Sequence, residues 1–321
     1  MTTNDTSAPA IEHRIGVSGR LAVKVADWDL DVTGVDGETA TVRSADGGSL
    51  PDGIEIERHG GGLTIHQPNR IFGLGGRSNV RLAIAVPIET AATIQTASGD
   101  VRVARLRGRQ EIRTASGDVV LDGIAEETSA ETVSGDIAIR VDGTVALTVK
   151  TVSGDVMIDG GWVERISLQT TSGDIRLTSP LGAGPHTIVT VSGDAIVASN
   201  SGIRVTAQTV AGDLRTSLPH TSDGRAGRRA LVVGDGATEV AFRSVSGDLR
   251  VVDATTGGLS LPTPPVPPVP PTAPTPPEPA TASGAPSDDA RLDILRTVER
   301  GEIDIVEAAE RLARLDGSTD D

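Results

Sequence analysis

Ser-Gly-Asp is the recurring tripeptide of this sequence, and its residues are the ones whose types and spacing could do chemistry. It begins at Ser98, Ser116, Ser134, Ser153, Ser172, Ser192 and Ser246, with an Ala-Gly-Asp variant at Ala211. Carboxylates repeated this regularly could form a metal site, because stacked like charges repel unless something neutralises them. Each repeat nevertheless supplies a single carboxylate, whereas Ca²⁺ takes about six to eight oxygen ligands.

We therefore interpret the tripeptide as a tight turn. Glycine reaches positive φ at no steric cost, and aspartate can accept a nearby backbone N–H in an Asx-type turn. The turn residues predicted in this way are Gly99, Asp100, Gly117, Asp118, Gly135, Asp136, Gly154, Asp155, Gly173, Asp174, Gly193, Asp194, Gly212, Asp213, Gly247 and Asp248. This interpretation predicts no cofactor and argues against a bound metal.

The other residues with catalytic potential do not form a recognisable set. His59-Gly60-Gly61-Gly62 is similar to an esterase oxyanion loop, but the Gly-x-Ser-x-Gly elbow that this chemistry needs is absent. The five histidines have no ligand-like spacing, and we expect His59 and His66 to be exposed to solvent. No Ser/His/Asp set stands out from the repeats, so we expect the protein not to be an enzyme.

The composition excludes several classes of function. The chain has 321 residues and a formal net charge of −15, and such an acidic surface repels phosphate backbones. Two Trp, two Phe and no Tyr are too few aromatic side chains for base-stacking platforms. Because the chain has no cysteine, disulfides and thiolate metal sites are excluded. We expect no nucleic-acid partner.

Apolar residues and threonine flank the tripeptides with a spacing of two, as in Ile112 and Thr114 before Ser116, and Val119 and Leu121 after it. This alternation on both sides of a turn predicts two β-strands per repeat, with alternate side chains in a core. Successive tripeptides begin 18, 18, 19, 19, 20, 19 and 35 residues apart. The long last interval predicts one degenerate unit between Asp213 and Ser246.

A repeat of 18–20 residues in fixed phase predicts a mainly β fold, a β-solenoid of the parallel β-helix kind. Each repeat then forms one coil, equivalent residues stack about 4.8 Å apart, and Ile139 and Ile158 are buried neighbours. The alternative is an antiparallel meander in which each repeat is a hairpin, and the spacing alone is compatible with both.

Residues 11–90 contain degenerate β repeats, which we expect to cap the N-terminal end of the rod. Leu30 fits the pattern if Asp27 occupies the serine position, and Leu63 and Ile65 fit it if Gly60 does. We expect a disordered N-terminus before this cap, at residues 1–10. The main Ser-Gly-Asp domain follows it at 91–260.

A Pro-rich linker at 261–286 ends the repeats, since residues 262–286 contain 12 of the 19 prolines. Such a spacer is semi-rigid and cannot donate ladder hydrogen bonds. The apolar spacing at 287–317 predicts a helical hairpin, followed by a short tail at 318–321. Two short helices cannot bury a core of their own, so we expect their stripes to contact a partner. The candidate contact residues are Leu292, Leu295, Val298 and Leu312.

Arg225, Arg228 and Arg229 form a local basic group where the repeat is interrupted, in a chain that is acidic overall. They are a second candidate contact site, because binding residues concentrate on loops. A solvated insertion is the alternative interpretation.

Units such as Thr-Val-Ser-Gly-Asp-Ile-Ala-Ile at 132–139 resemble those of a bacterial Ser-Gly-Asp β-strand-repeat family of unknown function, whose members are often labelled adhesins. The resemblance covers roughly residues 11–256. Residues 294–303 are similar to a short C-terminal helical hairpin that some members carry. The resemblance implies protein contacts through that hairpin and brings no catalytic residues with it.

These observations support two hypotheses. The first is a non-enzymatic scaffold or protein-interaction protein of this adhesin-like family, which binds a protein partner or itself through the helical hairpin. We expect it in the cytoplasm, because residues 1–19 lack the apolar stretch of a secretory signal and no run approaches the ~20 apolar residues of a membrane span. The alternative is a surface-exposed adhesin, exported by a non-standard route, that binds a glycan or protein ligand through the solenoid.

Overall fold

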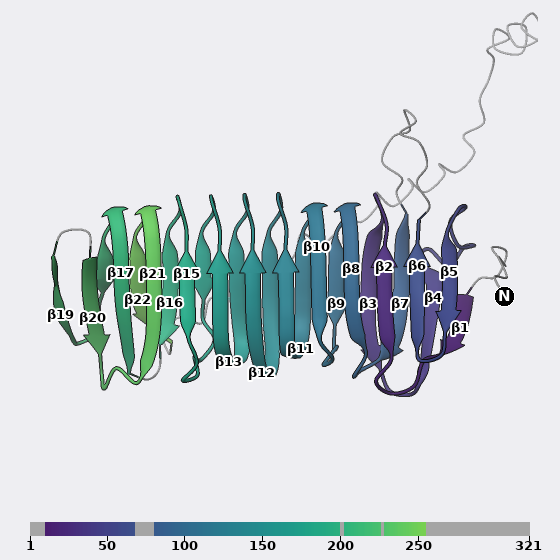
Figure 1. The fold of residues 1–321 in the computed structure, drawn as a ribbon, viewed down its shortest axis with the longest axis horizontal. Helices are drawn as coiled ribbons and strands as arrows, with labels where there is room; N and C mark the ends of the chain where they lie inside the picture. Colours follow the sequence, from purple (N-terminus) through teal and green to yellow (C-terminus); the bar gives the residue numbers. More distant parts are fainter. Residues whose placement is uncertain (1–9, 68–79, 200–201, 226–227, 255–321) are drawn as a thin grey trace, which may run out of the picture. The chain divides into compact units, whose positions relative to one another are not determined.

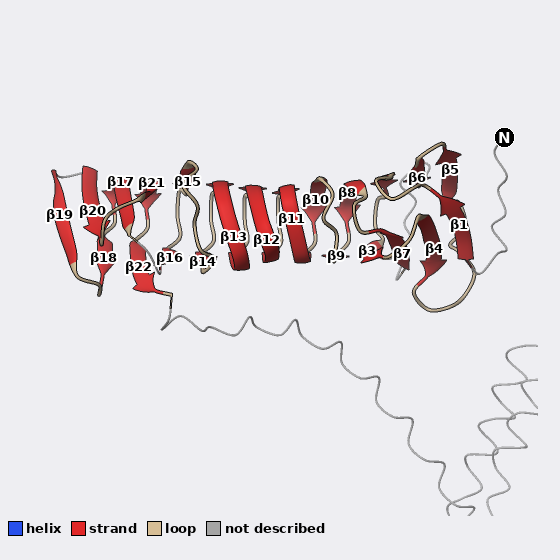
Figure 2. Ribbon diagram, turned by 90° about the horizontal axis from the view of Figure 1, so that it is seen from below, coloured by secondary structure: helices blue, strands red, loops and turns tan. Residues whose placement is uncertain are grey.

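In the computed structural model the described residues are 10–67, 80–199, 202–225 and 228–254, and they lie within one compact unit, Met1–Leu259. Every regular element among them is a β-strand (Figures 1 and 2). No helix in these ranges is long and apolar enough to cross a membrane. The predicted linker and helical hairpin, with Leu292, Leu295, Val298 and Leu312, lie outside the described residues.

One repeat forms one coil. Strand β10 (Gln110–Ser116) runs to a Ser-Gly-Asp corner, and β11 (Val119–Glu131) leads away from it. β11 bends between Asp122 and Glu126, where Gly123 and Glu126 have φ values of 67° and 61°. After the bend, its second half becomes the first strand of the next coil.

The first strands of the coils form one parallel ladder, with antiparallel strands added at its ends. In spatial order this first ladder contains β5 (Glu55–His59), β6 (Gly62–His66), β2 (Arg20–Lys24), β8 (Ala91–Ser98), β10, the C-terminal halves of β11, β12 (Ile137–Lys150) and β13 (Val156–Gln169), then β15 (His186–Val189), β21 (Thr238–Ser246), β17 (Ile203–Ala211), β20 (Arg228–Val233) and β19 (His220–Arg225).

The second strands form a second ladder. In spatial order it contains β1 (Ala10–Arg14), β4 (Thr39–Ser44), β7 (Arg81–Pro87), β3 (Asp29–Val35), β9 (Val101–Ala104), the N-terminal halves of β11, β12 and β13, then β14 (Ile175–Leu177), β16 (Ala195–Ser199), β22 (Leu249–Asp253) and β18 (Leu214–Thr216).

Equivalent residues of neighbouring coils pair in register. Ile139 of β12 pairs with Ile158 of β13 in parallel, and both side chains are fully buried, which confirms the predicted neighbours. The parallel pairing also excludes the antiparallel meander for the repeats. Inward residues from both ladders join one hydrophobic cluster. Each fully buried aliphatic side chain in it contributes roughly 1.5–3 kcal/mol.

Two coils lie out of chain order (Figure 1). β2 and β3 insert between the coil of β6 and β7 and the coil of β8 and β9. At the other end, β21 and β22 insert between the coil of β15 and β16 and the coil of β17 and β18. In Figure 1 this last coil is the yellow-green one, and it lies between teal and darker green strands.

The predicted degenerate unit between Asp213 and Ser246 is wrong. That stretch contains β19 and β20, which pair antiparallel as a hairpin, and β20 pairs antiparallel with β17. The interval is long because the chain builds this hairpin before it returns to insert the last coil. Antiparallel strands also cover β6 and β7 at the opposite end, where they block further parallel addition.

The two phases predicted within residues 11–90 have different outcomes. Leu30 pairs with Val101, so Asp27 occupies the serine position as predicted. Gly60 does not occupy it, because it lies in the turn of the β5–β6 hairpin, and Leu63 pairs with Leu21 ahead of the corner. The prediction for Gly60 failed because strands before and after a corner both alternate buried and outward residues with a period of two, so the pattern alone does not say on which side of a corner a strand lies.

Candidate functional site

The Ser-Gly-Asp corners stack into one continuous edge of the rod, where glycine is needed for two reasons. A Cβ on Gly154 would lie 2.1 Å from the carbonyl oxygen of Gly135 in the coil before it, well inside van der Waals contact. Its φ is 144°, and Gly117, Gly135, Gly173 and Gly193 also have the expected positive φ, whereas Gly99, Gly212 and Gly247 do not. Equivalent close approaches of 2.1–2.3 Å occur at Gly99, Gly117, Gly135, Gly173, Gly193, Gly212 and Gly247.

The aspartates of these corners form a hydrogen-bonded column along the rod. Asp155 Oδ1 accepts the backbone N–H of Asp174 at 2.8 Å, and the Asp155 N–H donates to Asp136 Oδ1 at 2.8 Å. We call this set the aspartate column; in spatial order it contains Asp29, Asp100, Asp118, Asp136, Asp155, Asp174, Asp194, Asp248 and Asp213, with N···O distances of 2.8–3.1 Å.

The predicted Asx-type turn is therefore wrong about the hydrogen-bond donor. The carboxylate of Asp155 accepts an N–H that lies 19 residues further along the chain, in the next coil. In-register stacking explains this, because it places the next corner's N–H about 4.8 Å along the rod, within reach of a short side chain. Each N–H also offsets part of the repulsion between stacked carboxylates.

Arginines close both ends of the aspartate column. At one end Arg81 Nη2 lies 3.5 Å from Asp29 Oδ2. At the other end the column has no further coil, and Arg229 Nη1 donates to Asp213 Oδ1 at 2.9 Å, where a backbone N–H would otherwise be. Arg215 Nη2 lies 2.7 Å from Asp213 Oδ2. These hydrogen bonds, from Arg215 first and Arg229 second, hold the pKa of Asp213 below its ordinary value.

The three arginines expected to form a basic contact site, Arg225, Arg228 and Arg229, do not act as one group, because Arg229 pairs with the aspartate column. Arg225 ends β19 and Arg228 begins β20, so the group lies on a hairpin and not in a loose insertion. Arg228 and Arg229 are both exposed, and Arg229 forms the ion pair with Asp213. The hairpin and Leu214 of β18 line a cavity of about 640 Å³ at this end of the rod.

No group of three or more His, Cys, Asp or Glu side chains that could hold a metal ion occurs within the residues that the structure describes. In the aspartate column, one oxygen of each carboxylate is already engaged by a neighbouring N–H or an arginine. What the column does chemically is link successive coils through hydrogen bonds from backbone N–H groups to side-chain oxygens.

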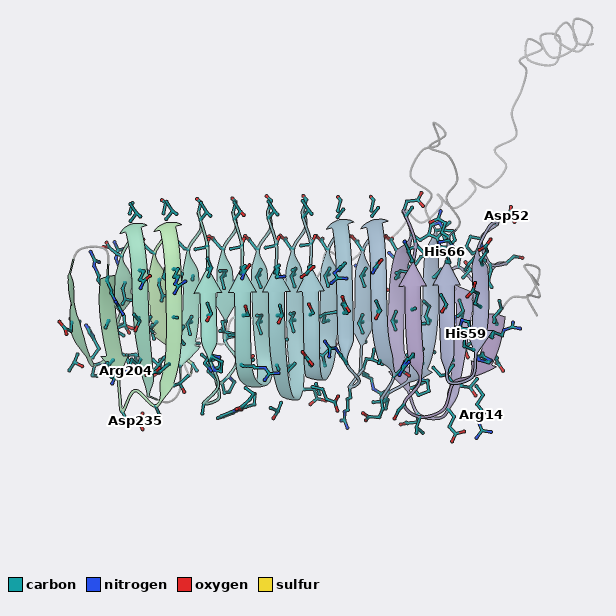
Figure 3. All side chains as sticks on the ribbon, viewed as in Figure 1. Arg14, Asp52, His59, His66, Arg204 and Asp235 are labelled. Atoms are coloured by element: carbon teal, nitrogen blue, oxygen red, sulfur yellow. The ribbon has the colours of Figure 1, made fainter. Side chains whose placement is uncertain are left out.

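A second column on this edge was missed in the sequence. The residue just before the serine of each Ser-Gly-Asp tripeptide, or before Ala211 in the variant, points outward, and it is apolar or threonine throughout. We call these residues the valine column; in spatial order they are Ala97, Ala115, Val133, Val152, Thr171, Val191, Val245 and Val210, and all are exposed. The valines are 46–85% exposed. Figure 3 shows the side chains that project along the edges of the rod.

The signal for this column was present in the repeats. Other outward positions of the same strands carry charges, as at Arg113, Glu131 and Lys150, three residues before each serine. Those three side chains form ion pairs across adjacent coils, with Lys150 Nζ 2.8 Å from Glu131 Oε1 and Arg113 Nε 3.1 Å from Glu131 Oε2. The hydrogen bond from Lys150 is the main reason why the pKa of Glu131 lies below its ordinary value.

His186 is the one histidine among those described that lies in the core. It takes the inward position that Ile166 and Val240 occupy in the neighbouring coils. Its Nε2–H donates to the carbonyl oxygen of Gly182 at 2.9 Å, while Nδ1 is buried without a hydrogen-bond partner. Burial lowers the pKa of this imidazole, mainly by desolvating the charged form. The phase of the repeat predicts this burial. His59 and His66 are at least partly exposed, as predicted.

One protein-family model matches most of the residues that form the rod. The model of the family described as Toastrack DUF4097 matches residues 19–252. No curated protein matches the chain. Among solved structures, similar folds occur in a candidate lipid-binding protein from Parabacteroides distasonis (15% identity, 76% of this chain and 96% of that one, TM-score 0.47) and a candidate adhesin from Bacteroides fragilis (11% identity, 75% and 95%, TM-score 0.45). A candidate adhesin from P. distasonis is similar at 15% identity, 75% and 95% coverage, and a TM-score of 0.44.

Proposed function

Because the chain belongs to the toastrack DUF4097 family, whose matched region spans the rod, we propose that it is a non-catalytic interaction protein. In this proposal the solenoid is a rigid scaffold, and the predicted helical hairpin at 287–317 is its association module. The observation that carries the proposal is the aspartate column. Its carboxylates, the most regular candidates for chemistry, are engaged in hydrogen bonds that join one coil to the next.

The proposed association is in trans, and self-association is favoured because it requires no further protein. The apolar stripes of the hairpin, with Leu295 and Leu312, need a surface to cover them. A Pro-rich spacer of 26 residues, 261–286, would be unnecessary if the hairpin docked on its own rod. The proposed compartment is the cytoplasm.

Light scattering tests this proposal. The full chain is compared with a chain truncated after Leu261, and with a full-length variant that carries Leu295→Asp and Leu312→Asp. We expect a multiple of the monomer mass for the full chain and the monomer mass for the other two. A matched variant, Thr297→Asp, adds a charge to the same hairpin outside the apolar stripe and should keep the larger mass. Equal monomer masses for all four proteins would rule out self-association.

The surface-adhesin alternative differs in where the protein is found. Cell fractionation with protease treatment of intact cells separates the two. A protein recovered only in the cytosol and protected from protease eliminates the adhesin, whereas surface recovery and cleavage eliminate the cytoplasmic scaffold.

A further inference from the structure

The valine column is an unusual surface for an acidic protein. Single exposed valines need no explanation, but a contiguous apolar strip marks an interaction site. Val133 and Val152 are adjacent, and Val191, Val245 and Val210 follow beyond Thr171, which also carries a methyl group. From Val133 to Val210 the strip crosses five coil-to-coil steps, or about 24 Å at the usual strand spacing.

The aspartate column runs parallel to this strip, three residues further along each repeat, so an apolar strip and a line of negative charge share one edge of the rod. Within the described residues, the salt bridges of the aspartate column involve only its ends, at Asp29, Asp248 and Asp213. Asp136, Asp155 and Asp174 form none there, although each accepts one backbone N–H. Their charge is therefore available to a partner.

We propose that this edge, the valine column together with the aspartate column, is the docking surface for a basic amphipathic helix of another protein. This deepens the proposed function, since it rests on the rod acting as an interaction scaffold and states the kind of partner. A helix of about 18 residues is some 27 Å long and presents an apolar stripe with a turn every 5.4 Å or so, close to the spacing of the coils. Lysine or arginine along one flank of that stripe would face the carboxylates.

The negative charge of the aspartate column favours a basic helix over the other possible occupants of this edge. A second copy of the rod would bring one aspartate column against another. The chain's own segment 288–321 holds eleven acidic and five basic residues, so it has the wrong sign. A membrane with anionic lipids would be repelled by the same carboxylates. A basic helix satisfies both columns at once.

The test uses the full-length protein and a fluorescein-labelled 18-residue peptide of leucine and lysine, patterned as an amphipathic helix, in fluorescence anisotropy at 150 mM salt. The control peptide has the same leucine face and glutamate in place of lysine. We expect saturable binding of the leucine–lysine peptide only. A variant with Val133→Ser, Val152→Ser and Val191→Ser should bind it at least about tenfold more weakly, because apolar contact area is lost while the net charge is unchanged.

A second pair of variants tests whether the peptide is attracted by the aspartate column itself or by the negative charge of the whole protein. The triple variant Asp136→Asn, Asp155→Asn and Asp174→Asn retains an Oδ1 acceptor for each N–H but removes three charges. The matched control Asp36→Asn, Asp46→Asn and Asp52→Asn removes three charges from exposed positions of the N-terminal cap. The column variant should bind the peptide more weakly and with a smaller dependence on salt than the control.

Equal affinity for both peptides, or unchanged affinity in the valine variant, would overturn the proposal, and so would equal losses in the two aspartate variants. The melting temperature of each variant is measured alongside, and a triple variant that melts early is replaced by the single substitution Val152→Ser, which should still weaken binding of the leucine–lysine peptide. The mass of the full chain in light scattering does not depend on the peptide, so failure here and failure of self-association are separate results.

Discussion

Aspartate at the corners accepts a hydrogen bond that joins one coil to the next. Its side chain is just long enough for Oδ1 to reach the N–H of the next corner, and that N–H would otherwise have no acceptor in the ladder. Asp155 illustrates this, because it accepts from Asp174 while its own N–H donates to Asp136. The carboxylate therefore contributes to stability mainly through its acceptor oxygen, and its charge is secondary.

Substitution of Asp155 tests this distinction. Asp155→Asn keeps the acceptor oxygen, so its free energy of unfolding should stay within about 0.5 kcal/mol of the wild-type value, whereas Asp155→Ala should lose about 0.5–1.5 kcal/mol. Urea denaturation at pH 7 measures both. Equal losses for the two variants would show that the charge, and not the hydrogen bond, stabilises the corner.

His186 makes stability depend on pH. Burial lowers its pKa in the folded protein, so the unfolded chain binds the proton more readily. Stability should therefore be fully present above the unfolded pKa of about 6.5 and fall below it, by at most about 1.4 kcal/mol per pH unit. In His186→Val, which follows Val240 of the next coil, this loss should disappear.

Urea denaturation at pH 7.5, 6.0 and 5.0 measures the effect as the difference between wild type and His186→Val. Other groups titrate alike in both proteins, so the difference isolates the imidazole. A difference that stays constant over these three pH values would contradict the burial of a neutral His186.

At the scale of the element, each strand contributes one buried and one outward set of side chains to columns that run through several coils. Ile158 pairs with Ile139 on one side and Leu177 on the other, and all three are fully buried. Met157, one residue earlier, points outward and lines a recess of about 110 Å³ beside Asp155 and Asp174. The two positions therefore have opposite environments within the same strand.

Substitution of lysine at the buried Ile158 and at the outward Met157 should have very different effects on stability. Ile158→Lys buries a charge without a partner and should cost about 3 kcal/mol or more, or prevent folding. Met157→Lys places its ammonium on an outward face, beside the carboxylates of Asp155 and Asp174 and beside its register partner Arg176, so the attractive and repulsive contacts offset each other and the free energy of unfolding should change by less than about 1 kcal/mol. Thermal unfolding monitored by circular dichroism compares them. A one-residue error in the register would reverse the two outcomes.

The sequence could predict features that are set within a single repeat, but not the order in which the coils stack. Within the repeats, the alternation around Ser116 predicted strands, faces and the Ile139–Ile158 contact, because burial follows a period of two. The order of the terminal coils was not predictable, since β2 and β21 have the same alternation as the strands on either side of them. Which coil a strand joins depends on long-range packing.

The same limit applies to the candidate site. The glycines and aspartates of the corners were found by their spacing, but the donor to Asp155 was not, because it lies in another coil. Arg229 was singled out for its charge, yet its role at the end of the aspartate column depends on the hairpin turning back onto β17. The valine column could have been found, since its position carries no charge in any repeat.

At the scale of the whole molecule, the repeat converts one short motif into long, regular columns. In-register stacking means that a single residue type at one phase becomes a strip of apolar surface, a line of carboxylates or a row of buried side chains. The antiparallel strands at the ends limit the rod to this length. The proposed binding surface exists only if one repeat makes one coil.

Engineered disulfides test that central claim most directly, because the chain has no cysteine. Ser134 and Ser153 are exposed and form a parallel β-bridge between adjacent coils. Their Cα atoms should therefore be about 4.8 Å apart, within the range of about 4.4–6.8 Å that a disulfide requires. Ser134 and Ser172 are two coils apart, at about 9.6 Å. Dilute protein is oxidised mildly and its free thiols are counted. We predict that Ser134→Cys with Ser153→Cys loses both thiols within the monomer, while Ser134→Cys with Ser172→Cys keeps them; the reverse pattern, or free thiols in both variants, would contradict the stacking of one repeat per coil.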